Sequence, residues 1–283
     1  MSVSPSASAQ AAREAVAGRL RDLRKEAGLT IVELARQCRW HYSKTSRIEN
    51  ALTGPTAKDI HRWCEATNSV DQAQGLIVQS LNAESIYREW RNQVRNGLKQ
   101  LQDSLAHFYR ETELFRVYSS TLVPGLLQTE GYAAAVLRTA ARFRELPVDD
   151  SAEAAQARVE RSRIIHERGH RFMILVEESV LHYQMADADA MAAQLGFLLT
   201  ASALPAVSLG VIPKSTRERT LWPEETFSVY DDKLVSVELV SAEVNVTQPS
   251  EIVLYVKAFE QLRGMAVYGA EARALILKAV EAL

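Results

Sequence analysis

Apolar residues in the first quarter of the chain recur at helical spacing and are separated by signals that end or begin helices. The apolar positions are Val16, Leu20, Leu23, Ile60 and Trp63. Between these stripes, Gly28 ends one helix, and Thr30 with Glu33 three positions later has the spacing of a capping box. Pro55 indicates a turn before the last stripe. The pattern predicts a succession of short helices between residues 11 and 67.

A longer apolar seam follows. Large apolar residues occur in it at mostly three- and four-residue steps: Tyr87, Trp90, Val94, Leu98, Leu101, Leu105, Phe108 and Phe115. This spacing predicts a helix of several turns, with Gly97 as a mild interruption. The seam would pack against its own domain or against a second subunit, and the first arrangement is favoured.

The second half of the chain has a different pattern. Short runs rich in β-branched residues and bounded by Gly, Pro or Asp predict strands at 172–176, 206–212, 226–230 and 234–240. Helical stretches are expected at about 129–139, 150–167, 188–202, 250–265 and 270–282. This half is therefore mixed α and β with a small sheet, and its strand order stays open. The expected fold class of the whole chain is α+β.

These patterns divide the chain into four segments. Residues 1–10 are rich in Ser and Ala without apolar periodicity, and a disordered tail is expected there. An all-helical domain is expected over 11–70, a helical connector over 71–116 and the mixed domain over 117–283.

Composition is that of an ordinary folded protein. Of 283 residues, 47% are apolar and 24% are charged, which excludes wholesale disorder. Two cysteines, Cys38 and Cys64, are too few for a disulfide framework or a Cys-rich zinc site. No apolar stretch approaches the roughly 20 residues of a membrane helix, and the first residues lack the features of a signal peptide. A cytoplasmic protein without a membrane partner is expected.

The net charge of −2 conceals a division along the chain. Residues 1–70 contain 11 Lys and Arg and 7 Asp and Glu, a balance of +4, so the remainder carries −6. A basic first segment on an acidic body is compatible with a nucleic-acid-binding module joined to a second function.

Residues 31–50, IVELARQCRWHYSKTSRIEN, have the spacing of a helix-turn-helix. Ala35 is the small residue where two helices cross, and the inward positions around it are Leu34, Cys38, Trp40, Thr45 and Ile48. The second helix would run from about Tyr42 to Asn50 and fit the major groove of DNA. The residues expected to lie at the DNA are Thr30, Arg39, His41, Tyr42, Ser43, Lys44, Ser46 and Arg47.

The segment GLTIVELARQCRWHYSKTSRIENALTGPTAKDIHRW resembles the Cro/repressor-like (XRE) helix-turn-helix regulators, above all in SRIEN and in the Pro55 turn. Three positions depart from that pattern. Arg39 stands where the turn often has Gly, His41 where the recognition helix usually begins with Ser, and Ile31 where a phosphate-contacting Gln is frequent. The resemblance implies a transcriptional regulator that binds operator DNA, and such repressors commonly act as homodimers. A helical hairpin that binds no DNA is the alternative.

The stretch VYSSTLVPGLLQTEGYAAAVL at 117–137 is similar to the signature of a C-terminal domain of actinobacterial regulators, where it follows this type of helix-turn-helix. RVERSRII, FMILVEESVLH and LVSVELV fit later parts of that family. The resemblance implies an antitoxin-like regulator with a small protein partner encoded nearby. From the residues alone, Pro124-Gly125 predicts a turn, and Leu126, Leu127 and Tyr132 are expected in the core rather than in a ligand site.

The stretch His166-Glu167-Arg168-Gly169-His170 matches the HExxH pattern of zinc proteases. That chemistry needs both histidines on one face of a continuous helix. Gly169 is expected to end the helix and His170 to lead into a strand. A metal site is therefore not expected here.

Catalytic patterns are also missing from the sequence. It contains no serine elbow, phosphate-binding loop or dinucleotide motif, and Glu177-Glu178 near Asp187 and Asp189 are expected to be solvated. No enzyme activity and no cofactor are expected. Two alternatives to a partner-binding regulator stay open: a regulator that senses a small molecule, and an enzyme targeted to DNA.

Overall fold

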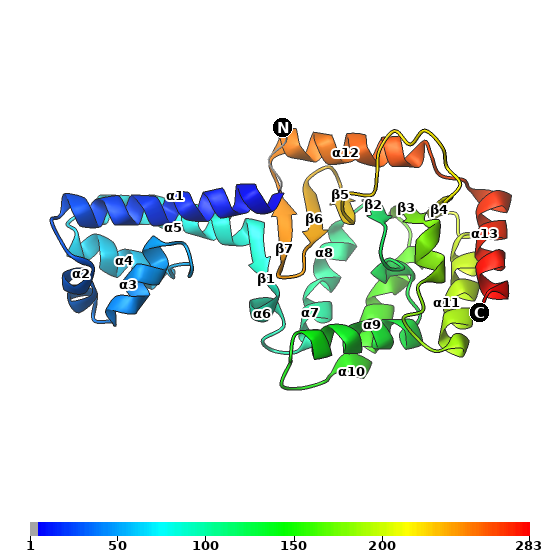
Figure 1. Cartoon of the computed structure of the whole chain (residues 1–283), viewed down its shortest axis with the longest axis horizontal. Coiled ribbons are helices and arrows are strands. Elements are labelled where there is room, and N and C mark those ends of the chain that lie inside the picture. Colours follow the sequence, from blue (N-terminus) through cyan, green and yellow to red (C-terminus); the bar gives the residue numbers. More distant parts are fainter. Residues whose placement is uncertain (1–4) are drawn as a thin grey trace. The chain divides into compact units, whose positions relative to one another are not determined.

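The computed structural model describes residues 5–283 and shows two compact units (Figure 1). The first unit ends at Arg88 and the second spans Glu89–Leu283. The segment 71–116 therefore does not form a connector of its own. Its first part belongs to the helical unit, and the rest belongs to the α/β unit.

The first unit is all-helical. Its helices are α1 (Pro5–Glu26), α2 (Ile31–Cys38), α3 (Tyr42–Glu49), α4 (Ala57–Ala66) and α5 (Val70–Ile86). The apolar stripes of the sequence meet in one core, whose largest member is the fully buried Trp63. The Trp63 indole Nε1 donates a hydrogen bond to the Leu20 carbonyl at 3.0 Å, so α4 is tied to α1 as well as packed on it.

Helix α1 begins earlier than the composition predicts. The expected tail covers residues 1–10, whereas the helix starts at Pro5, and residues 1–4 lie outside the described residues. Alanine is the strongest helix former, and proline is tolerated in the first turn of a helix. A Ser/Ala-rich segment therefore extends a helix that is already nucleated by the packing of its later turns.

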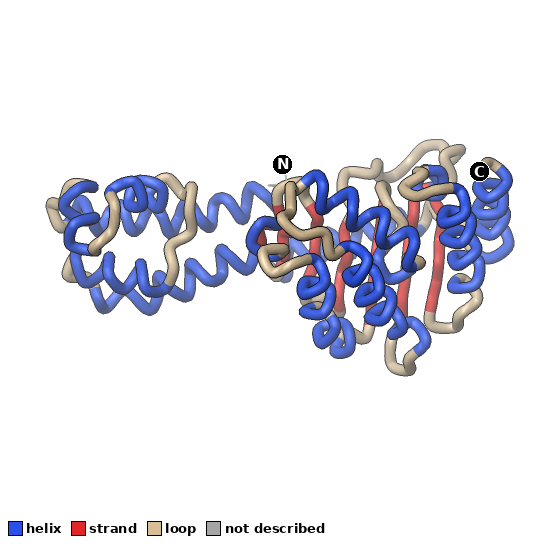
Figure 2. The backbone as a smooth tube through the Cα atoms, turned by 90° about the horizontal axis from the view of Figure 1, so that it is seen from below, coloured by secondary structure: helices blue, strands red, loops and turns tan. Residues whose placement is uncertain are grey.

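The second unit is a mixed sheet flanked by helices (Figure 2). Its strands are β2 (Leu114–Ser119), β3 (Arg171–Glu177), β4 (Val207–Ile212), β5 (Phe227–Tyr230), β6 (Leu234–Glu238) and β7 (Ala242–Val246). They follow the order β7-β6-β5-β2-β3-β4 in a sheet of seven strands, whose edge strand β1 (Tyr87–Glu89) spans the division between the units. Strands β2, β3 and β4 are parallel, and β2, β5, β6 and β7 pair antiparallel.

Helices cover both faces of this sheet. They are α6 (Trp90–Gln93), α7 (Leu98–Ser104), α8 (Ala106–Glu111), α9 (Glu130–Phe143), α10 (Ser151–Ser162), α11 (Ala188–Ala201), α12 (Pro249–Arg263) and α13 (Gly269–Glu281). Residues of α9, α11 and α13 form the main core with one face of β2–β4, and α12 contacts β5 and β6. Leu126, Leu127 and Tyr132 are buried in the main core, as predicted. The α+β class is confirmed.

The long helix predicted through Tyr87–Phe115 is wrong. Gly97 has a φ of 99° and breaks the segment, and Phe115 lies in strand β2. The Asp150 carboxylate accepts hydrogen bonds from the backbone amides of Leu98 and Lys99 at 3.0 and 2.9 Å and so begins a new helix. Three- and four-residue spacing persisted across these short elements because each presents its own apolar side to a core. Val94, Leu98 and Leu101 pack with residues of α9 and α10, whereas Phe115 lies in the main core.

All four predicted strands are present, whereas β1, β2 and β7 were not predicted. Phe115 of β2 continues the three- and four-residue spacing of the predicted helix, so this part of the chain was assigned to the helix instead of to a strand. Strand β7 alternates apolar and polar residues over only five positions. Within residues 5–283, no helix has the length and apolar character needed to cross a membrane.

Gly210 provides a test of the packing around β4. A Cβ added there would lie 2.8 Å from the Tyr268 ring and 2.9 Å from a Leu175 methyl group. We expect Gly210→Ala to lower the free energy of unfolding by about 1–3 kcal/mol. Gly196→Ala is the matched control, because its Cβ would meet no atom within 4 Å inside α11. It should raise stability by about 0.5–1 kcal/mol in the same urea titration. Equal effects of the two changes would contradict the close contact at Gly210.

Candidate nucleic-acid interface

Helix α2 begins at the predicted capping box. Thr30 Oγ1 accepts a hydrogen bond from the Glu33 amide at 3.2 Å and donates to Glu33 Oε2 at 2.7 Å, while the Thr30 amide donates to the same carboxylate at 2.8 Å. These bonds, led by the one from the hydroxyl, lower the pKa of the exposed Glu33. Thr30 is exposed, but its hydroxyl already serves the helix start.

The turn into α3 keeps its geometry despite the departures from the XRE pattern. Arg39 takes the left-handed conformation, with φ 59° and ψ 48°, where Gly is common. His41 begins α3 in place of Ser, and its Nδ1 accepts a hydrogen bond from the Ser43 amide at 3.3 Å. The Trp40 indole donates to Thr45 Oγ1 at 2.8 Å, which holds the turn against the helix.

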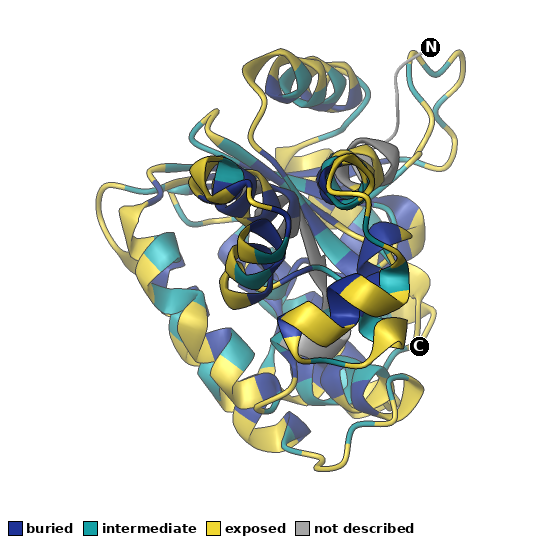
Figure 3. Cartoon of the chain, turned by 90° about the vertical axis from the view of Figure 1, so that its left-hand side faces the viewer, coloured by how far each residue is buried: buried dark blue, intermediate teal, exposed yellow. Residues whose placement is uncertain are grey.

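Helix α3 has one buried and one exposed side. Thr45, Ile48 and Glu49 are buried. Four of the expected DNA-contacting residues, His41, Tyr42, Ser43 and Arg47, are exposed, and Ser46 is half-exposed. Figure 3 shows exposed and buried residues on the same helices of this unit. The predicted spacing therefore places these residues on the solvent side of a well-anchored helix.

Lys44 differs from the expectation that it projects outward. Its Nζ lies 2.6 Å from Asp59 Oδ1 and 4.8 Å from the centre of the Trp40 ring. Burial by itself would raise the pKa of Asp59, but its hydrogen bonds with Lys44 and Thr56 outweigh this effect and lower it. Lys44 thus stabilises the packing of α3 on α4, and its charge is largely compensated.

Arg47 is the candidate with an uncompensated charge. Its side chain is exposed, and among the described residues its guanidinium forms no ion pair or hydrogen bond. Ser43 lies one helical turn before it, so both side chains project from the same side of α3.

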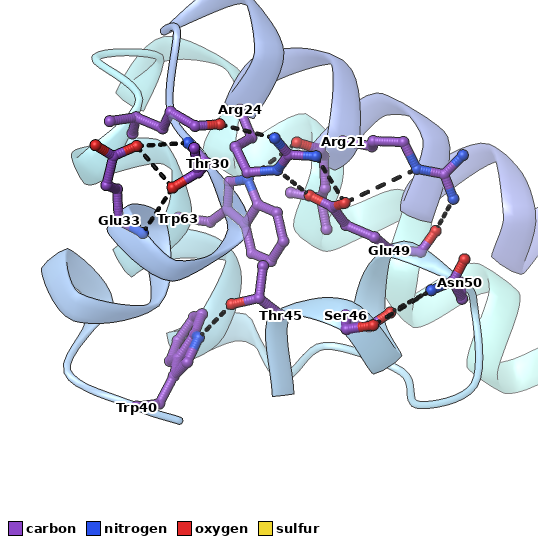
Figure 4. A network of polar contacts seen from close by, with 12 residues as sticks. Arg21, Arg24, Thr30, Glu33, Trp40, Thr45, Ser46, Glu49, Asn50 and Trp63 are labelled. Carbon is purple, nitrogen blue, oxygen red and sulfur yellow. Dashed lines mark hydrogen bonds and ion pairs between the residues drawn. The ribbon is translucent and has the colours of Figure 1, made fainter. Parts of the chain in front are cut away.

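An ion-pair network behind α3 was not predicted (Figure 4). Glu49 is 4% exposed, and Arg24 of α1 donates to both of its carboxylate oxygens at 2.5 and 2.9 Å. Arg24 also donates to the Leu29 carbonyl at 2.7 Å, and Arg21 donates to the Glu49 carbonyl. Arg24 thereby links α3 to α1 through the Glu49 carboxylate, and it also binds the turn before α2. The signal was available, since Glu49 follows Thr45 and Ile48 on the inward side of the helix.

Of the acidic residues expected to be solvated, Asp187 and Asp189 are exposed, whereas Glu177 and Glu178 are buried. Glu177 is buried and accepts hydrogen bonds from Tyr118 at 2.8 Å and from Arg219 at 2.5 Å. Glu178 is also buried, and it accepts a hydrogen bond from the Lys214 amide at 2.8 Å. The chain after β4 folds back and supplies Arg219 and Lys214, while Tyr118 comes from β2. Each carboxylate therefore has its own partners.

The two histidines of the HExxH stretch do not share a helix: His166 ends a 3-10 turn, and His170 directly precedes β3. The helix ends at Ser162, well before Gly169, and a 3-10 turn (Arg163–His166) follows. His170 Nδ1 lies 2.7 Å from the Thr112 carbonyl. In the described part of the chain, no group of three or more His, Cys, Asp and Glu is arranged to hold a metal ion. Cys38 and Cys64 are buried and unpaired, and burial raises the pKa of the Cys38 thiol to about 11.

Comparisons with known families follow the division into two units. A family model described as a helix-turn-helix domain matches residues 15–74. A second, described as a domain of unknown function (DUF5753), matches residues 102–278, which is more than half of the chain. No curated protein and no solved structure matches the chain.

The Glu49 network leads to a stability prediction. Removing one partner of a buried ion pair leaves the other charge uncompensated, so we expect Glu49→Gln to lower the free energy of unfolding by about 3 kcal/mol. Chemical denaturation followed by tryptophan fluorescence would measure this, because Trp63 lies in the same core. Glu26→Gln is the control, since its ion pair with Arg19 is exposed and should contribute little. A similar result for both variants would show that the network does not hold α3 in place.

Proposed function

Since the chain belongs to the family defined by the domain of unknown function DUF5753 and carries a helix-turn-helix domain before it, we propose that it is a sequence-specific transcriptional regulator. In this proposal α3 enters the major groove of an operator. The observation that supports it best is the exposed side of α3, with Arg47 and Ser43 one turn apart and no internal partner for the Arg47 guanidinium among the described residues.

The proposed roles follow from where each side chain lies. Tyr42, Ser43, Ser46 and Arg47 would contact base edges, because they occupy the outward side of α3. Thr30, Arg39 and His41 lie at the helix ends and in the turn, and they would contact the phosphate backbone with Lys44 beside them. The positive balance of residues 1–70 would favour the approach to DNA.

We expect Arg47→Ala to weaken operator binding about tenfold without changing stability, because the guanidinium is exposed and supports no internal contact. If Arg47 contacts phosphate, the slope of log affinity against log salt concentration should also fall by about one. Fluorescence anisotropy on the genomic fragment that the wild-type protein retains would measure both. Lys25→Ala is the control for a lost surface charge, since Lys25 is exposed at the end of α1. Unchanged binding by Arg47→Ala would exclude α3 as the DNA-reading helix.

A homodimer on two half-sites about one helical turn apart is part of the proposal, as is common for helix-turn-helix repressors. The C-terminal unit would act without catalysis or cofactor, in an antitoxin-like role, by binding a small protein encoded nearby. Two features support a protein partner. The body carries a balance of −6, and α12 exposes Val253 and Leu254 at 64% and 54%. Apolar side chains exposed in neighbouring positions are typical of protein contact sites.

We expect the full chain to co-purify with the small protein encoded beside it, and the partner to change the affinity for operator DNA. Such a change requires the partner to prefer one DNA-binding state of the protein. Leu254→Asp should abolish the complex and leave DNA binding by the chain alone unchanged. Glu271→Lys would be the control for a changed surface residue, since Glu271 is exposed on a different helix, α13. An unaffected complex would exclude this part of α12.

The small-molecule sensor is the second candidate function, and a pocket in the second unit, lined among others by Gln102, Tyr109 and Arg161, favours it. An enzyme targeted to DNA is the alternative from another class, and it would be recognised by substrate turnover.

A further inference from the structure

A pocket of the second unit lies between α7 and α8 on one side and α10 on the other. Its volume of about 730 Å³ falls in the range of about 300–1,000 Å³ that is typical of small-molecule sites. Asp150 at the start of α10 accepts hydrogen bonds from the first amides of α7, so these two helices begin side by side. Farther along, an alanine stands in each wall, Ala106 in α8 and Ala157 in α10. These small side chains leave space between the helices.

Arg161 lies between apolar side chains in the lining of this pocket. Ala157 precedes it by one helical turn, and Ile164, in the 3-10 turn after α10, follows it by about one turn. On the opposite wall, Ala106 and Tyr109 are also one turn apart on α8. This part of the pocket therefore combines one guanidinium with an apolar lining.

Neutral groups hold the Arg161 side chain in place. Its Nη1 donates hydrogen bonds to Gln102 Oε1 at 2.9 Å and to the Gln102 carbonyl at 3.3 Å. Its guanidinium lies 4.6 Å from the centre of the Tyr109 ring. Gln102 is buried, so the amide that orients the guanidinium is itself held in position. An amide and an aromatic ring fix a guanidinium without neutralising its charge.

The charge of Arg161 is uncompensated within the described part of the chain. There the guanidinium forms no ion pair, Nη2 donates no hydrogen bond, and Nε is buried without a hydrogen-bond partner. Gln102 Oε1 also accepts a hydrogen bond from Arg158 at 3.1 Å, so two guanidiniums share one neutral oxygen. Burial, and after it the charge of Arg161, lower the pKa of Arg158 to about 10. Positive charge is therefore concentrated at this wall of the pocket.

The other charged residues of the lining disfavour an anion with more than one charge. Lys99 and Arg163 are already paired with Asp103 and Glu160, at 2.7 and 3.0 Å. Three further residues are exposed and form no ion pair among the described residues: Arg110, Glu153 and Glu167. Without Arg161, the lining thus has one carboxylate more than it has cations. A phosphate dianion would be repelled by this excess, whereas one negative charge can be matched by Arg161.

We propose that this pocket binds a monocarboxylic acid with a small apolar body. The carboxylate would accept hydrogen bonds from Arg161, because such charge-assisted bonds are about twice as strong as bonds between neutral groups. The apolar body would lie against Ala106, Ala157 and Ile164, where it is removed from water. This assignment rests on the small-molecule sensor, the second candidate of the proposed function, and names its ligand class. DNA binding through α3 does not depend on it.

The test uses the full chain, with sodium phenylacetate and sodium hexanoate as probes and the corresponding amides as neutral controls. We expect at least one carboxylate to raise the melting temperature by about 3 °C at roughly ten times its dissociation constant. Its amide should give no comparable shift at the same concentration, because it lacks the charge that Arg161 would bind. Sodium chloride at the same concentration corrects for ionic strength.

Two variants change different parts of the pocket. Arg161→Gln removes the charge, and Ala157→Leu fills the apolar part, so each should abolish the shift. Ala152→Leu is the matched control for a larger side chain on the same helix, and Arg168→Gln is the control for a lost charge. Both control positions are exposed and lie outside the lining, so both variants should keep the shift. Ala157→Leu stays decisive if Arg161→Gln does not fold, because it leaves the contacts of Arg161 with Gln102 unchanged.

Absence of a shift with both carboxylates would overturn the proposal, as would an equal shift with the amides or a full shift in Ala157→Leu. Fluorescence anisotropy with the operator fragment tests the sensor function separately. A carboxylate that binds in the pocket without changing the affinity for the operator would support the site and exclude that ligand as an effector.

Discussion

The buried ion pair between Glu49 and Arg24 is the constraint on which the geometry of the first unit depends. Glu49 ends the helix whose other side is exposed, so its carboxylate must be compensated inside the protein. Arg24 meets both of its oxygens, and Arg21 binds the Glu49 carbonyl. The orientation of α3 is thereby set from behind, and the exposed side chains of Tyr42 and Arg47 take no part in this network. A recognition surface can then vary without loss of the fold.

Because α3 is held from its buried side, the turn before it tolerates Arg39 and His41. The turn needs one residue in the left-handed region and a helix start that satisfies an amide, and neither requirement demands a particular side chain. Arg39 accepts the backbone conformation at a cost of about 1–2 kcal/mol relative to Gly. His41 satisfies the Ser43 amide through its ring nitrogen. Trp40 and Thr45 keep the turn in register on the buried side.

The arginines of the two units differ in whether a carboxylate compensates their charge. In the first unit, Arg24 is neutralised by a carboxylate and serves stability. In the second, Arg158 and Arg161 are held by Gln102, Gln128 and Tyr109, which orient a charge without cancelling it. Gln128 lies in the PGLLQT stretch, so a segment that first looks like a core turn also holds an arginine of α10. Both arrangements supply hydrogen-bond acceptors to a guanidinium, but only the ion pair of the first unit also supplies an opposite charge.

The sequence by itself determined the features that depend on neighbours along the chain. The Thr30 capping box, the buried spacing from Leu34 to Ile48 and four of the strands follow from local propensity and periodicity, which act within a few residues. Tertiary structure decided which charges are compensated. Lys44 meets Asp59 fifteen positions away, and Arg24 meets Glu49 twenty-five positions away. It also decided that Phe115 lies in strand β2. There the backbone groups of β2 form hydrogen bonds with β3 on one side and with β5 on the other. Periodicity reports which side of an element is apolar, but only the packed chain determines which groups meet.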